Sequence, residues 1–201
     1  MVGDHDHLLL GTLLPYLTLT AYVNVGIVNG TEAKPHSRPY MVSVQKDGKD
    51  RCGGFLVSKQ FVMTAAHRLN GTAKKSKTGK DGDIKANSKC SVAGWGTNST
   101  NGRTSNHLME VDVTTKDKKT CKKFWGQTYS TSRMVCAGGH GGFCQEDSGE
   151  PLVCGVTAVG VVSFNENNNC DTPTYPNVYT EISAFLTWMK AILGSVNQDL
   201  D

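Results

Sequence analysis

The chain has 201 residues, seven of them cysteine, and a formal net charge of +3. This length suits one ordinary domain or two small barrels, and the composition is neither disordered nor fibrous. So small a charge gives no sign of nucleic-acid binding. The cysteines indicate an oxidising compartment, and the absence of a Cys-x-x-Cys pair argues against a structural metal.

An apolar run at residues 8–17 opens the chain. It is too short to span a bilayer comfortably, and Pro15 interrupts it, so we interpret it as the core of a secretory signal peptide. We expect residues 1–26 to be a signal peptide and a short propeptide. Secretion would make three Asn-x-Ser/Thr sequons glycan acceptors, at Asn29, Asn70 and Asn98.

Most of the remaining pattern is typical of β-strands. Residues 39–44 and 55–64 alternate or run apolar, and Gly48, Gly53 and Gly54 punctuate them, which predicts antiparallel strands with turns. Residues 108–113 alternate as a half-buried strand does, and residues 156–164 form a long apolar strand. Apolar residues at helical spacing predict a C-terminal helix over 182–193. Gly194 is placed to end it, before a tail at 195–201.

Two stretches are rich in lysine. Residues 68–89 are polar and would hold only about two short strands, so they are expected to form an exposed loop. A second basic run, a solvated surface by default, contains Lys116, Lys118, Lys119, Lys122 and Lys123.

The central stretch is residues 144–154, where Ser148 lies between Asp147 and Gly149 and a cysteine brackets each end. Serine is a poor nucleophile unless a base and oxyanion donors are close to it. On this stretch alone, a polar turn held by disulfides is an equally good interpretation.

Other segments give this stretch a context. They are residues 27–30 (Ile-Val-Asn-Gly), 61–67 (Phe-Val-Met-Thr-Ala-Ala-His), 163–165 (Ser-Phe-Asn) and 176–179 (Pro-Asn-Val-Tyr). Together these resemble the trypsin-like (chymotrypsin-fold) serine endopeptidases, most closely the granzyme and mast-cell-protease branch. The resemblance implies an all-β fold, a chymotrypsin-like double antiparallel β-barrel with a C-terminal α-helix. It covers a domain at 27–194, with the first barrel truncated around residues 68–89.

The resemblance also assigns roles. His67 would be the general base and Ser148 the nucleophile, with the N–H groups of Glu146 and Ser148 forming the oxyanion hole. In a zymogen of this kind, cleavage before Ile27 frees an α-amine that folds inward and pairs with Asp147. The protein would then be secreted or stored in a secretory granule, and would act on protein or peptide substrates without a cofactor, a metal or a membrane span.

The implied substrate pocket carries no acidic residue, so selection of lysine or arginine is not expected. Its residues are Gly142, Phe143, Ser163, Phe164, Asn165 and Asn177. The bulky Phe143 is expected to narrow it.

The resemblance implies three disulfides, Cys90 with Cys154, Cys121 with Cys136, and Cys144 with Cys170. Cys52 remains as a free thiol, because the family places its partner at the position of Arg68.

The chain departs from the family at the points that matter most for chemistry. The family's triad aspartate falls in the stretch that is missing between His67 and Cys90, and neither Asp81 nor Asp83 is assigned as its substitute. Glutamates also replace family glycines at 146 and 150. Three interpretations stay open: an impaired serine endopeptidase, an inactive homologue that binds protein or sulfated glycosaminoglycan, and a truncated transcript or faulty gene model of an active protease.

Overall fold

The computed structural model describes residues 27–65, 84–166 and 169–197. Several sequence predictions therefore lie outside the described residues. These are the leader at 1–26, the general base His67, the position Arg68, the sequon Asn70, the carboxylates Asp81 and Asp83, and the end of the tail at 198–201.

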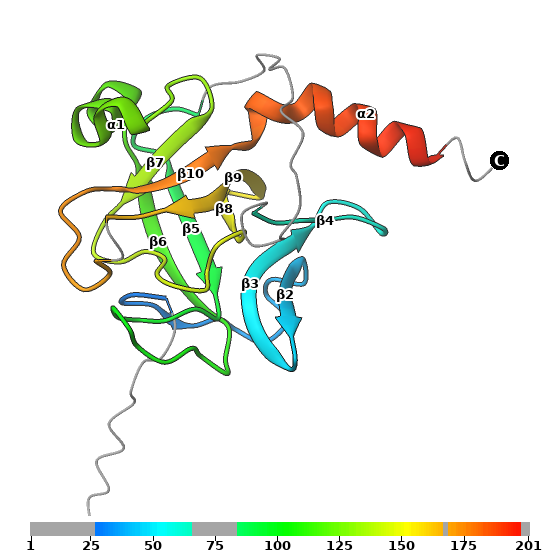
Figure 1. The fold of residues 1–201 in the computed structure, drawn as a ribbon, viewed down its shortest axis with the longest axis horizontal. Helices are drawn as coiled ribbons and strands as arrows, with labels where there is room; N and C mark the ends of the chain where they lie inside the picture. The colour runs from blue at the N-terminus through cyan, green and yellow to red at the C-terminus, as the bar shows by residue number, and fades with distance from the viewer. Residues whose placement is uncertain (1–26, 66–83, 167–168, 198–201) are drawn as a thin grey trace, which may run out of the picture.

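A closed antiparallel barrel occupies the C-terminal two thirds of the described chain (Figure 1). Neighbouring strands pair in the order β6-β5-β8-β9-β10-β7, and pairing of β6 with β7 closes the ring. The strands are β5 (Lys89–Gly94), β6 (Met109–Thr115), β7 (Met134–Gly138), β8 (Pro151–Cys154), β9 (Thr157–Phe164) and β10 (Asn177–Glu181). A short strand, β1 (Thr31–Glu32), pairs with the beginning of β6, at Met109 and Glu110.

The barrel forms because its strands place apolar side chains inward at alternate positions. On β6, Met109 and Val113 are buried while Asp112 is exposed, as the sequence alternation predicts. Val92, Leu152 and further apolar residues complete the core.

The other sheet has three strands in the described part of the chain, so the first barrel is incomplete. They are β2 (Met41–Lys46), β3 (Lys49–Leu56) and β4 (Val62–Met63). The predicted strand at 55–64 is broken, because Val57 N–H bonds to the Phe61 carbonyl in a tight turn. Leu56 and Val62, which are register partners, stay 45% and 44% exposed at the sheet's short edge strand.

Gly53 and Gly54 lie inside β3 and do not mark a turn as the sequence predicts. A Cβ on Gly53 would lie 1.8 Å from the Glu150 side chain, and one on Gly54 would lie 2.8 Å from the Met63 carbonyl oxygen. Glycine in a strand commonly marks such a close approach. These two glycines therefore allow other segments of the protein to pack closely against the sheet.

Two α-helices accompany the sheets, together with the 3₁₀ turns η2 (Gly126–Thr128) and η3 (Ile182–Phe185). The second basic run forms a helix, α1 (Lys118–Trp125), whose N-terminus is capped by Asp117 accepting from Thr120 N–H at 2.8 Å. The predicted C-terminal helix is α2 (Leu186–Asn197), which continues beyond Gly194. Gly194 does not end the helix because it lacks the left-handed φ of a glycine cap.

Disulfides join Cys90 to Cys154, Cys121 to Cys136 and Cys144 to Cys170, the pairs that the resemblance implies. Cys52 is a free, buried thiol. No helix among the described residues combines the length and apolar character needed to cross a membrane.

Candidate active site

The turn that carries Ser148 is bonded to both sheets. The Ser148 carbonyl accepts from Gly53 N–H of β3 at 3.0 Å, and Gly149 N–H donates to the Val162 carbonyl of β9 at 3.2 Å. Val162 N–H in turn donates to the Glu150 carbonyl at 2.8 Å. Ser148 is 8% exposed, so the serine lies in a rigid, nearly enclosed turn between the sheets.

Gly149 can only be glycine in this arrangement. Its φ is +97°, and a Cβ there would lie 2.4 Å from both the Gly53 carbonyl oxygen and Thr64 Oγ1, and 2.8 Å from Ala65 N. The chain that leads to His67 therefore passes directly against the serine turn. The structure brings the two predicted catalytic segments together up to Ala65, two positions before the histidine.

Asp147 is completely buried beside the serine. Its Oδ1 accepts from Gly96 N–H at 2.7 Å and its Oδ2 accepts from Cys144 N–H at 2.9 Å. Burial raises the pKa of Asp147 to about 7, although these two backbone donors favour the ionised form. The Asp147 carboxyl group thus connects the serine turn to the backbone at Gly96 and at Cys144.

Glu150 is also completely buried, which the sequence analysis did not anticipate. Its side chain fills the space above two glycines, because a Cβ on Gly53 or on Gly94 would lie 1.8 Å from it. The Glu150 carboxyl lies close enough to the Asp147 carboxyl to affect its pKa, and its Oε2 has no hydrogen-bond partner among the described residues. Burial raises the pKa of Glu150 well above its usual range, and the negative charge of Asp147 raises it further.

The close contact between Gly94 and Glu150 predicts the effect of a single methyl group. Gly94→Ala should lower the free energy of unfolding by about 3 kcal/mol, because the methyl group overlaps the Glu150 carboxyl. The double variant Gly94→Ala, Glu150→Gly should recover most of the lost free energy of unfolding. In Gly194→Ala, where nothing lies within 4 Å, urea unfolding should instead show a gain of about 1 kcal/mol. If Gly94→Ala lowers the free energy of unfolding equally in the wild type and in Glu150→Gly, the contact between Gly94 and Glu150 is contradicted.

Glu146 occupies the predicted oxyanion position in a conformation that suits glycine. Its φ is +70°, which costs a residue with a side chain about 1–2 kcal/mol. Its Oε2 is buried without a hydrogen-bond partner in the described part of the chain. The backbone therefore keeps the shape of a glycine turn, while the side chain adds a carboxyl group beside it.

Ile27 lies in the core of the closed barrel and is completely buried, in the same cluster as Phe143. Its neighbour Val28 exchanges backbone hydrogen bonds with Gly142, at 2.9 and 3.3 Å. The segment that would follow activation cleavage is therefore packed against the segment that leads into the serine turn. The pairing of the Ile27 amine with Asp147 stays a prediction.

The predicted pocket residues divide into two groups. Asn177 lies against Gly142, where a Cβ would meet its Nδ2 at 2.4 Å, and this Nδ2 donates to the Phe143 carbonyl at 3.4 Å. The Phe143 ring does not narrow a pocket as expected. It is 4% exposed and packs edge-on against Tyr179 in the barrel core, with ring centroids 5.3 Å apart.

The other group lies at the end of β9. Ser163, Phe164 and Asn165 are all partly exposed there. The Phe164 ring packs edge-on against Trp125 of α1 at 5.0 Å, which fixes the end of the strand. Asn165 Nδ2 donates to the sulfur of Cys170, which ties it to the third disulfide.

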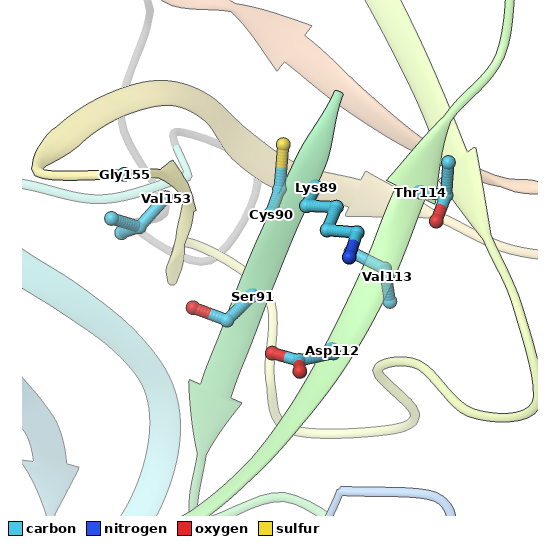
Figure 2. A pocket seen from close by; sticks show the side chains of 8 residues that line it. All are labelled: Lys89, Cys90, Ser91, Asp112, Val113, Thr114, Val153 and Gly155. Carbon is cyan, nitrogen blue, oxygen red and sulfur yellow. The ribbon is translucent and has the colours of Figure 1, made fainter. Parts of the chain in front are cut away.

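A separate hollow of about 310 Å³ lies over β5 and β6, away from the serine turn. Figure 2 shows Ser91, Asp112 and Lys89 lining it from these two neighbouring strands. Its lining includes neither the predicted catalytic serine nor the predicted pocket residues, so it takes no part in the candidate site.

A closed barrel and a second, three-stranded sheet, joined through a Gln-Glu-Asp-Ser-Gly turn that follows a disulfide-bonded cysteine, point to a class of protein. The sequence profile of the family described as Trypsin matches residues 27–83 and 68–189. The chain therefore belongs to this family, the trypsin-like serine proteases.

Known relatives agree with this assignment. Serine protease 57 of Rattus norvegicus is 32% identical over 227 aligned positions that cover 81% of each chain. Granzyme M of Homo sapiens is 30% identical, with 92% of this chain and 96% of the relative covered. Among solved structures, mouse brain neuropsin has a TM-score of 0.72 at 25% identity and covers 83% of this chain and all of its own.

The alignment with serine protease 57 also bears on the gap. Its 227 aligned positions exceed the 201 residues of this chain, so the relative contains residues that have no counterpart here.

Proposed function

We propose that the chain is a granzyme-like serine endopeptidase with strongly reduced turnover, in which Ser148 is the nucleophile and His67 the general base. The main observation behind this proposal is the serine turn, which is held to β3 and β9 by backbone hydrogen bonds. Such rigidity is what a preorganised nucleophile and oxyanion hole require. The close packing of Gly149 on Thr64 and Ala65 supports a histidine two residues further on as the neighbouring base.

The reduced turnover follows from two features of the same site. Loss of one oxyanion donor costs on the order of 10²- to 10³-fold in rate, and Glu146 brings a carboxyl group to this position. Loss of the acid that orients the histidine costs on the order of 10⁴-fold. The two losses do not simply add, but either one slows acylation severely.

Activation and location form the second part of the proposal. Cleavage before Ile27 would create an α-ammonium group, since such amines titrate near pH 8. The buried Asp147 carboxyl would be its partner, and the burial of Ile27 and the pairing of Val28 with Gly142 support an inward path for this segment. We propose that the protein is a glycosylated zymogen, made with a signal peptide and secreted or stored in granules.

A fluorophosphonate probe, which labels activated serines, tests the proposal. We expect slow labelling of the activated chain that disappears in Ser148→Ala, at a rate at least about 100-fold below that of an active granzyme. Labelling that persists in Ser148→Ala would contradict the assignment of the nucleophile. Labelling as fast as that of the granzyme would contradict the impairment.

Glycosaminoglycan binding is a second candidate function, and α1 favours it. Lys118 Nζ is 3.1 Å from the buried Glu181 carboxylate, and Lys122 Nζ donates to the Tyr129 carbonyl at 3.1 Å. These two lysines therefore have structural roles. Lys119 and Lys123 are exposed one helical turn apart, with the partly exposed Lys116 nearby in the chain.

On a heparin column, we expect the Lys119→Ala, Lys123→Ala double variant to elute at clearly lower salt than the wild type. A matched control replaces Lys34 and Lys59, two exposed lysines outside α1, and should elute with the wild type. Elution of the wild type itself at low salt would contradict glycosaminoglycan binding.

A further inference from the structure

The interior beside Ser148 contains a pair of carboxyl groups that the peptidase mechanism does not use as a pair. Asp147 and Glu150 are 0% and 1% exposed, Glu150 N–H donates to the Asp147 carbonyl at 3.2 Å, and each carboxyl group affects the pKa of the other. The titratable groups that face them are the Cys52 thiol of β3, the Tyr179 hydroxyl of β10 and Glu146 of the same turn. None of these is a cation, and neither carboxyl forms an ion pair within the described ranges.

Two carboxylates in contact inside a protein cannot both remain ionised, because repulsion and the loss of water both oppose the charge. One proton must therefore be shared between them at neutral pH. The structure indicates which group carries it. Both oxygens of Asp147 accept backbone N–H groups, which stabilise a negative charge, while Glu150 has only the Trp95 backbone to do so and its Oε2 has no partner among the described residues.

We propose that Glu150 is a positioning residue of the serine turn, which as an un-ionised acid donates a hydrogen bond to Asp147 and so holds Ser148 in place. The inference rests on the proposed function only in taking Ser148 as the nucleophile. Before any cleavage, the nitrogen of Ile27 belongs to an uncharged amide. Glu150 supplies Asp147 with a partner in that form of the chain, so the turn is built without an α-ammonium group.

This pair gives the fold an unusual dependence on pH. The pKa of each carboxyl is raised by burial in the folded chain, for Asp147 from 3.8 to about 7. The folded state therefore holds protons that the unfolded chain has released. Stability is fully present below the unfolded value near pH 4, and it is lost as the pH rises through about 7.

The experiment compares the uncleaved wild type with Glu150→Gln, which keeps the shape and an N–H donor but cannot titrate. Infrared difference spectra at pH 8, above the pKa of about 7 of Asp147, should show the carbonyl band of a protonated carboxylic acid in the wild type and lose it in the variant. Between pH 5 and pH 8, the unfolding equilibrium constant of the wild type should rise about tenfold more per pH unit than that of the variant. Amide protection at Gly53, whose N–H bonds to the Ser148 carbonyl, should fall with rising pH more steeply in the wild type than in the variant.

Glu181→Gln is the matched control, because Glu181 is 1% exposed but pairs with Lys118 and not with another acid. It should keep the infrared band and the slope of the wild type. Equal slopes in the wild type and Glu150→Gln, or a band that survives in this variant, would overturn the proposal. If Glu150→Gln does not fold, the absence of the band from the wild type at pH 8 would do so. None of these measurements requires Ser148 to react, so they are independent of the peptidase assignment.

Discussion

Replacing Cys90 and Cys154 with alanine should lower the free energy of unfolding by about 4 kcal/mol. This disulfide closes a loop with a sequence separation of 64 residues, so it restricts the unfolded chain strongly. It also joins β5 to the end of β8, two paired strands of the closed barrel that carries the serine turn. Urea unfolding under non-oxidising, metal-free conditions measures the loss.

The disulfide between Cys121 and Cys136 provides the comparison. Its sequence separation is 15 residues, so its removal should cost less, about 3 kcal/mol. The difference between the two variants reports on the loop length, since both bonds are anchored in the same barrel. A smaller loss for the Cys90–Cys154 pair than for the Cys121–Cys136 pair would contradict this account of the barrel's stability.

Glu146→Gly should raise the rate of Ser148 labelling by about 100-fold. Glycine accepts the φ of +70° without strain, so the backbone N–H keeps the geometry of an oxyanion donor. The substitution also removes the carboxyl group from the place where negative charge develops. Relief of the strained φ should add about 1 kcal/mol to the free energy of unfolding.

Glu146→Ala separates the two causes, because it removes the charge but keeps a side chain at the strained position. We expect it to recover only part of the rate and none of the stability attributed to φ. Equal labelling rates for the alanine variant and the glycine variant would show that charge alone limits the site. Unchanged labelling in both variants would remove Glu146 from the explanation.

Much of the second barrel could be predicted from the sequence. The alternation of residues 108–113 and the apolar run at 156–164 correspond to β6 and β9, because strand periodicity is a local property. The place of Gly53 and Gly54 inside β3 could not be predicted, for the opposite reason. They permit close approach of Glu150 and of the Met63 backbone, which are distant in sequence or in another strand, and a local pattern cannot show this.

The candidate site was predictable in its residues but not in its interactions. The motif identifies Ser148 and Asp147, and it shows that Glu150 replaces a family glycine. It does not show that this side chain turns inward over Gly94 and lies beside the Asp147 carboxyl group. The sequence did contain one sign of this arrangement, the glycines at 53 and 94. Their missing side chains leave the space that Glu150 fills.

The central claim is that the acid which should orient His67 is absent from this chain. Asp81→Asn and Asp83→Asn test it most directly, since these are the carboxylates nearest to the missing stretch. The labelling rate of Ser148, measured in the faster Glu146→Gly background, is predicted to stay within about twofold in both variants. A fall on the order of 10⁴-fold in either one would identify that aspartate as the third member of a working triad.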